Sequence, residues 1–74
     1  MNWDRVEVNW RLYRGKVRQT WDRLTDEQLD VIAGRRGALA VRLQQVYGFT
    51  WDDAERQIRD WERQHLKPDE LHRL

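Results

Sequence analysis

Between residues 3 and 24 an apolar side chain recurs at every third or fourth position, and this spacing constrains the fold more than any other feature of the chain. At 100° per residue, an arc of about 80° on one helix face collects the whole set: Trp3, Val6, Trp10, Tyr13, Val17, Trp21 and Leu24. The basic residues of the segment fall on the flanks of this arc. A platform for stacking nucleic acid bases would need rings exposed beside the charges. We therefore expect these rings to lie in the core of a helical domain.

The size of the chain makes large side chains valuable to such a core. With 74 residues the chain supports one core, which rarely contributes more than ~3–5 kcal/mol without reinforcement. The chain has no cysteine, so disulfides and thiolate metal sites are excluded. Its five tryptophans can each bury ~150–250 Å² and are the expected reinforcement.

Capping signals divide the chain into four predicted helices. The first has Asn2 as its N-cap and runs to about Leu24. The second begins at Asp26, where Thr25 and Gln28 match a capping box, and Gly34 suits its left-handed C-cap. A third helix ends at Gly48. Thr50 caps a fourth, which places Trp51, Ala54, Ile58 and Trp61 on one face and stops by Pro68 at the latest.

The predicted fold class is all-α, a compact four-helix bundle with one helical domain at residues 1–66. Residues 67–74 form a tail that either frays or docks as a short turn. The predicted core combines the aromatic stripe with apolar residues of the other three helices: Trp10, Tyr13, Val17, Trp21, Leu29, Ile32, Leu39, Leu43, Ile58 and Trp61.

Overall composition indicates a folded, very soluble protein. Charged residues make up 36% of the chain and the mean hydropathy is −1.05, yet the net charge is only +1 and aromatic residues reach 11%. No apolar run approaches the ~18–20 residues of a membrane span, and the first ten residues lack the apolar centre of a signal peptide. We expect a cytoplasmic protein.

Two apolar residues, Val8 and Leu12, fall opposite the stripe on the same predicted helix. Isolated apolar residues are normal on a protein surface. Alternatively, this patch receives leucines of the tail region (Leu66, Leu71 and Leu74) or a second copy of the protein. We expect a monomer, with weak self-association left open.

Arginines provide the one candidate for a binding surface. A nucleic acid or another anion would be held by Arg11, Arg14, Arg18, Arg35, Arg36 and Arg42, provided that the first helix and segment 34–48 converge. Segment "GRRG", Gly34 to Gly37, lacks the spacing of a phosphate-binding P-loop and is more simply a turn between helices. The near-neutral net charge of the chain also argues against a nucleic acid module.

Catalytic and metal chemistry have little support. Both histidines, His65 and His72, lie near the C-terminus, and with Glu62 or Asp69 they match no zinc pattern. The carboxylates of the fourth helix are expected to be caps and helix-surface pairs: Asp52, Asp53, Glu55, Asp60 and Glu62. A small filled core also leaves little room for a pocket of ~300–1,000 Å³. We expect no catalytic residue, no cofactor and no metal, and hence no enzyme.

An ordered series of residues resembles the CsbD-like family, including its YjbJ type. The series comprises Asn9-Trp10, Gly15-Lys16-Val17, Trp21, Leu24-Thr25-Asp26, Ile32, Gly34-Arg35-Arg36, Leu39, Tyr47-Gly48, Ala54-Glu55 and Trp61. The resemblance covers about residues 2–62 and implies a small bacterial protein of the general stress response, with no catalytic residues to transfer. It also implies two roughly orthogonal helical hairpins, of the kind grouped with SAM-like domains.

The chain departs from that family pattern at several positions: Trp3, Val8, Leu12, Gly37 and Val41. Gly37 stands where an acidic residue is usual and weakens the N-cap of the third helix. The leading hypothesis is a non-enzymatic stress-response protein with an unknown partner. The alternatives are the arginine-based nucleic acid module and a set of helices that opens onto membranes, which would sacrifice most of the fold.

Overall fold

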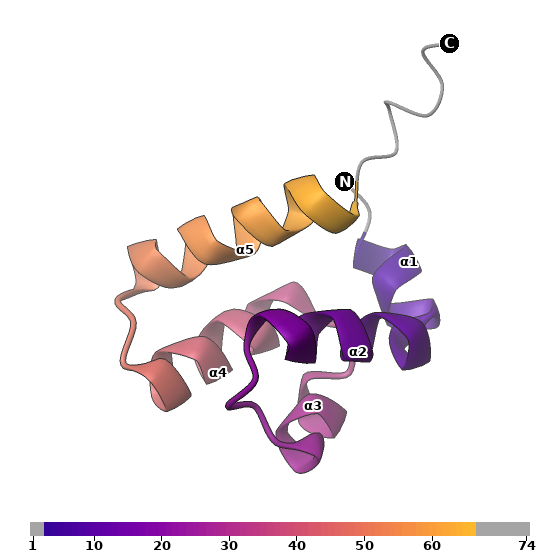
Figure 1. Ribbon diagram of the computed structural model, residues 1–74, viewed down its shortest axis with the longest axis horizontal. Helices are drawn as coiled ribbons and strands as arrows, with labels where there is room; N and C mark the ends of the chain where they lie inside the picture. Colours follow the sequence, from indigo (N-terminus) through magenta and orange to yellow (C-terminus); the bar gives the residue numbers. More distant parts are fainter. Residues whose placement is uncertain (1–2, 67–74) are drawn as a thin grey trace, which may run out of the picture.

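Helices account for all the regular structure that the computed structural model describes, which covers residues 3–66. Figure 1 shows their order along the chain: α1 (Trp3–Val8), α2 (Trp10–Thr20), α3 (Asp26–Ile32), α4 (Arg36–Tyr47) and α5 (Trp51–His65). The all-helical class is confirmed. The number of helices is not, because the predicted first helix is two helices.

The break between α1 and α2 lies at Asn9. Its φ and ψ of −105° and 33° leave the helical region, and its side-chain Nδ2 donates to the Arg5 carbonyl at 3.1 Å. The Asn9 N–H also donates to the Arg5 carbonyl at 3.0 Å and so ends α1, whereas the Asn9 carbonyl accepts from Leu12 and Tyr13 at the start of α2. Figure 1 shows α1 turned out of line with α2 as a result. The 3–4 apolar spacing continues through the break, so periodicity alone did not reveal it.

The C-terminal end of α2 also differs from the prediction. The helix stops at Thr20 rather than near Leu24, and Trp21 donates its N–H to the Val17 carbonyl at 2.9 Å as the C-cap. Trp21 and Leu24 nevertheless remain buried. The turn between them reverses the chain, so that α3 packs back against α2.

Two of the three predicted N-caps, Thr25 and Thr50, are confirmed. The Thr25 hydroxyl accepts from the Gln28 N–H at 3.1 Å, and the Gln28 side chain accepts from the Thr25 N–H at 2.9 Å, which completes the capping box. At the start of α5, the Thr50 hydroxyl accepts from the Asp53 N–H at 3.1 Å. Both helices therefore begin where the sequence predicts.

At the helix C-termini, left-handed residues end α3 and α4. Gly48 is the C-cap of α4, as predicted, with φ 73°. For α3 the prediction was wrong by one position, because Ala33 (φ 52°) is the C-cap and Gly34 (φ 81°) follows it. A Cβ on Gly34 would lie 2.6 Å from the Glu7 Cα, so this glycine allows the turn to touch the backbone of α1.

The core lies between all five helices. Of the predicted set, eight side chains are buried, whereas Trp10 and Tyr13 are half-buried and pack against the core. The buried apolar residues are Val6, Val17, Trp21, Leu24, Leu29, Ile32, Leu39, Ala40, Leu43, Ala54, Ile58, Trp61 and Leu66. Trp51, predicted to share the inner face of α5, is instead 50% exposed, because it occupies the first helical position, beyond the edge of the core.

Several sequence-based expectations fall outside the described residues. These are the Asn2 cap, the stop at Pro68, the fate of residues 67–74, and docking by Leu71 or Leu74. Within residues 3–66, no helix combines the length and apolar character needed to cross a membrane.

Candidate functional site

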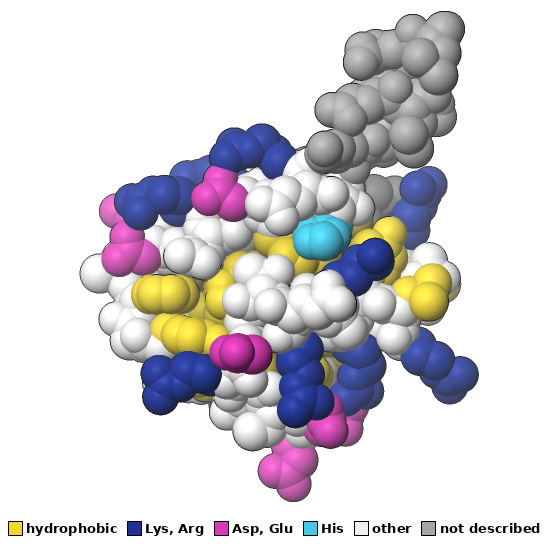
Figure 2. Space-filling view, in the orientation of Figure 1, with side chains coloured by type: hydrophobic (Ala, Val, Ile, Leu, Met, Phe, Trp, Pro, Cys, Tyr) yellow, Lys and Arg dark blue, Asp and Glu magenta, His cyan; other side chains and the backbone are white. Residues whose placement is uncertain are grey.

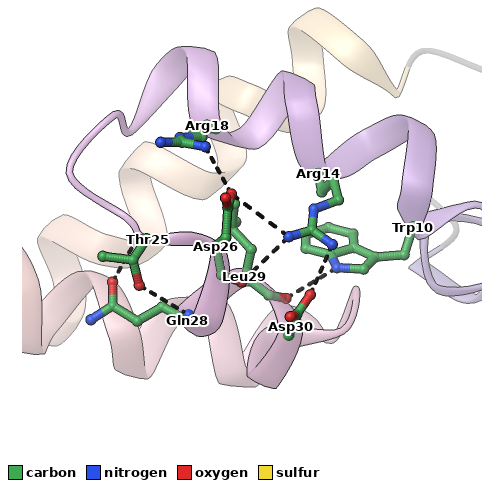
Figure 3. Close-up of polar contacts among 8 residues, drawn as sticks. All are labelled: Trp10, Arg14, Arg18, Thr25, Asp26, Gln28, Leu29 and Asp30. Carbon is green, nitrogen blue, oxygen red and sulfur yellow. Dashed lines mark hydrogen bonds and ion pairs between the residues drawn. The ribbon is translucent and has the colours of Figure 1, made fainter.

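Arg14 and Arg18 of α2 face the acidic helix α3. Arg14 donates from Nη1 to Asp30 Oδ1 at 2.8 Å and from Nη2 to the Asp26 carbonyl at 3.3 Å. Arg18 donates from Nη1 to Asp26 Oδ1 at 2.7 Å. Figure 3 shows both guanidinium groups converging on α3, beside the Trp10 indole that donates to the Leu29 carbonyl. These two arginines hold α3 against α2.

Arg36 is at the start of α4 and pairs with α5. Its Nε donates to Glu62 Oε2 at 2.8 Å, and its Nη1 donates to Glu55 Oε1 at 2.8 Å. Burial lowers the pKa of Arg36, but hydrogen bonds and charge interactions with Glu62 and Glu55 outweigh it and raise the pKa above its ordinary value. Arg36 therefore stays charged throughout the neutral range.

The other three candidate arginines make weaker interactions with the rest of the protein, or none. Arg35 Nε lies 3.6 Å from Glu7 Oε2, and Arg42 donates from Nη1 to the Gln45 side-chain oxygen at 2.8 Å. Arg11 is exposed and has no ion pair or side-chain hydrogen bond within residues 3–66. Ion pairs thus bind most of these arginines to α1, α3 and α5 rather than bring the six together in one anion site.

Trp61 is the centre of an aromatic cluster that sequence reasoning did not resolve in this form. Its ring centroid lies 5.6 Å from that of Trp3, 6.2 Å from Tyr13, 6.4 Å from Trp21 and 4.9 Å from His65. Edge-to-face and tilted pairs at these separations stabilise beyond the area they bury. The cluster joins α1, α2 and α5.

Indole N–H groups of this cluster find acceptors in the protein. Trp3 Nε1 donates to Glu62 Oε2 at 2.8 Å, and Trp21 Nε1 donates to Gln57 Oε1 at 3.1 Å. Trp61 Nε1 makes a long contact of 3.5 Å with the Lys16 carbonyl. No fully buried side-chain nitrogen or oxygen in the described part lacks a partner.

Glu62 is the most buried charged side chain that the structure describes, at 7% exposure. The expectation of a helix-surface pair was wrong for Glu62, which pairs with Arg36 across the fold. Half-buried Glu55 does both, because it pairs along α5 with Arg59 at 3.9 Å and across the fold with Arg36. Asp53 and Asp60 also pair along α5, with Arg56 and Arg63. The glutamates could not be singled out by helix position alone, since their partner lies on another helix.

Groups that could hold a metal or perform acid–base chemistry lie apart or are already paired. Within residues 3–66, no three His, Cys, Asp or Glu residues gather closely enough to hold a metal ion. His65 lies against the Trp61 ring, and His72 falls outside the described residues. Glu55 and Glu62 share a guanidinium, which holds both carboxylates in a structural ion pair.

The outward side of α2 has a different character. Leu12 is 69% exposed and Val8, at the end of α1, is 83% exposed. Arg11 and Lys16 are exposed on the same helix. Figure 2, in which α2 lies toward the viewer, shows basic side chains gathered over this helix and a hydrophobic group at the surface near its junction with α1.

Relatives in three bacteria match most of the chain. The UPF0337 protein YjbJ of Escherichia coli O6:H1 is 38% identical over 88% of this chain and 94% of its own length. The UPF0337 protein RPA4217 of Rhodopseudomonas palustris is 46% identical over 82% and 92%, and ECA0631 of Pectobacterium atrosepticum is 40% identical over 88% and 94%. No protein-family model matches the chain. The relatives' names give a family and no activity.

Proposed function

This chain belongs to the UPF0337 family, and we propose that it is a CsbD-like protein of the bacterial stress response that acts as a folded cytoplasmic domain without catalysing a reaction. The stress-response part rests on the ordered series from Asn9-Trp10 to Trp61 that resembles the CsbD-like family. The two-hairpin, SAM-like arrangement is part of the same proposal, and the packing of α4 on α5, which would be the second hairpin, supports it.

The observation that carries the non-enzymatic part is the pairing of Glu55 and Glu62 with Arg36. A general acid or base must reach a substrate proton at ~2.6–3.2 Å. Instead, Glu62 accepts hydrogen bonds from Trp3 and Arg36, and both carboxylate oxygens of Glu55 accept from Nη1 of the same guanidinium. These groups stabilise helix packing, which is a structural use of charge.

A gene deletion tests the stress-response part. Immunoblots should show the protein accumulating in stationary phase or after heat or salt shock, and a deletion strain should survive that stress less well than its parent. Plasmid-borne wild-type chain should restore survival. Unchanged protein level and unchanged survival under all three stresses would refute the proposed role.

Complementation with a carboxylate variant tests the non-enzymatic part. Glu55→Gln keeps the size of the side chain and removes its charge, so the variant should restore survival as long as circular dichroism shows it folded. A folded Glu55→Gln protein that fails to complement would contradict the purely structural use of this group. Arg56→Gln, an exposed change on the same helix, is the control.

The nucleic acid alternative has less support. Four of its six arginines form ion pairs with carboxylates of the protein itself, namely Arg14, Arg18, Arg35 and Arg36. A phosphate would have to compete with those carboxylates.

A further inference from the structure

We propose that the outward side of α2 binds anionic phospholipid surfaces while the fold stays closed. This inference concerns a face that the proposed stress-response role leaves unused, and it does not depend on that role. We define this α2 outer face by six exposed residues: Val8, Arg11, Leu12, Gly15, Lys16 and Gln19.

Charge is the first observation that supports the proposal. Segment Trp10–Thr20 contains four basic residues, Arg11, Arg14, Lys16 and Arg18, and no acidic residue. Arg14 and Arg18 are neutralised by α3, whereas Arg11 and Lys16 have no ion pair within residues 3–66. The uncompensated positive charge of α2 therefore lies on its outer side, where an anionic surface could approach it.

Exposed apolar side chains are the second observation. Val8 and Leu12 are the two most exposed large hydrophobic residues in the described part of the chain. Leu12 and Lys16 are one helical turn apart and so share a face. Gly15, between them, has no side chain to hold a surface away. Apolar tips flanked by basic groups are typical of helices that lie in the bilayer interface.

The closed fold distinguishes this binding from the opening of the helices. Val17, on the opposite side of α2, is fully buried, and Trp10 and Tyr13 pack against the core. The core face thus anchors α2 while Val8 and Leu12 point outward. Membrane contact needs no core residue to be released.

A lipid surface fits this face better than two other partners. None of its six residues is aromatic, so it offers no ring on which nucleic acid bases could stack. A stable protein partner would need ~800 Å² of complementary surface on each side. A bilayer interface instead accepts the convex side of a single helix, with basic groups at the level of the headgroups.

Vesicle co-sedimentation tests the proposal with the full chain. The probes are vesicles of phosphatidylglycerol and phosphatidylcholine in equal parts, with pure phosphatidylcholine vesicles as the comparison, at ~20 and ~200 mM salt, between which the Debye length falls from ~21 to ~7 Å. We expect binding to the anionic vesicles at low salt, weakening at high salt, and none to the neutral ones. Circular dichroism should keep the same helix content with and without vesicles.

Paired variants separate the contributions of charge and apolar contact. Arg11→Gln with Lys16→Gln should weaken binding ~25-fold, at about fivefold per charge. Val8→Ser with Leu12→Ser should weaken it at least ~10-fold, because the apolar tips no longer enter the interface. Arg56→Gln with Arg59→Gln, which removes the same charge from exposed positions of α5, should change binding less than ~2-fold.

Each contrary outcome overturns the proposal. Absence of binding to anionic vesicles at low salt would do so. Binding that Val8→Ser with Leu12→Ser leaves unchanged would also overturn the proposal. The apolar side chains would then make no contact with lipid, and any polyanion, such as DNA, could replace the vesicle. A loss of helix content on binding would show that the core opens, and an equal effect of the α5 pair would show that only net charge matters.

Discussion

Among single residues, Glu62 accepts hydrogen bonds from two other helices. Its Oε2 accepts from Trp3 on α1 and from Arg36 on α4, and the preceding residue, Trp61, is the centre of the aromatic cluster. A carboxylate so little exposed is tolerated because charged and neutral donors replace its water. One side chain of α5 therefore fixes two other helices.

Removing this carboxylate should destabilise the fold. We expect Glu62→Ala to lower the free energy of unfolding by about 2–3 kcal/mol, because it leaves the Trp3 indole and one edge of Arg36 without an acceptor. Urea unfolding followed by circular dichroism measures the loss. Asp60→Ala is the matched control on the same helix, where an exposed pair with Arg63 should contribute less than about 1 kcal/mol. Similar losses in both variants would show that Glu62 has no special role.

Between elements, the contact of the α3–α4 turn with α1 depends on a missing side chain. Gly34 has φ 81°, and the nearest backbone atom to a Cβ at this position would be the Glu7 Cα at 2.6 Å. Gly48 has a similar φ of 73° but open space around it. A comparison of alanine substitutions at the two glycines therefore separates the cost of backbone strain from the cost of steric contact.

We predict that Gly34→Ala destabilises the protein more than Gly48→Ala does. Both alanines incur the left-handed backbone cost of about 1–2 kcal/mol. Only Gly34→Ala must also displace α1, and it should lose at least about 1 kcal/mol more. Thermal or urea unfolding of the two variants gives the comparison. Equal losses would mean that α1 moves away from the turn without cost.

Within α2, Gly15 weakens the helix. It lies in the interior of the helix, is exposed, and has open space where an alanine methyl group would lie, with nothing within 4 Å. We expect Gly15→Ala to stabilise the protein by about 0.5–1 kcal/mol, because alanine restricts the unfolded chain and favours the helix. A lower urea midpoint for the variant would contradict this prediction.

Across the whole molecule, structural features that depend on neighbouring residues were predictable from the sequence, and contacts between distant residues were not. The Thr25 capping box, the Thr50 cap and the inward positions of Leu29, Leu39 and Ile58 follow from spacing within one helix. The break at Asn9 leaves the apolar spacing unchanged and so left no trace in the pattern. The Arg36–Glu62 pair joins residues 26 positions apart, which periodicity cannot detect.

For the candidate arginines too, the sequence predicts the local feature and not the long-range contact. The sequence identified them by charge, but charge does not reveal whether a carboxylate elsewhere in the fold is already the partner. Arg14 and Arg18 meet α3, and Arg36 meets α5. Arg11 and Arg42 are the candidates left without a carboxylate partner in the described structure. The predicted interface is therefore divided among structural ion pairs.

Because Arg14, Arg18, Arg35 and Arg36 pair with carboxylates of the fold, we expect these arginines not to form a joint nucleic acid interface. The test is fluorescence anisotropy of labelled DNA and RNA, titrated with the protein between ~50 and ~200 mM salt, because six to ten phosphate contacts would cost ~10³–10⁵ in affinity over that range. We predict weak binding or none, with a salt dependence no steeper than about three phosphate contacts would give, the number available from Arg11, Lys16 and Arg42. Tight binding with the steep salt dependence of six contacts would contradict the claim and show that the ion pairs open to form one surface.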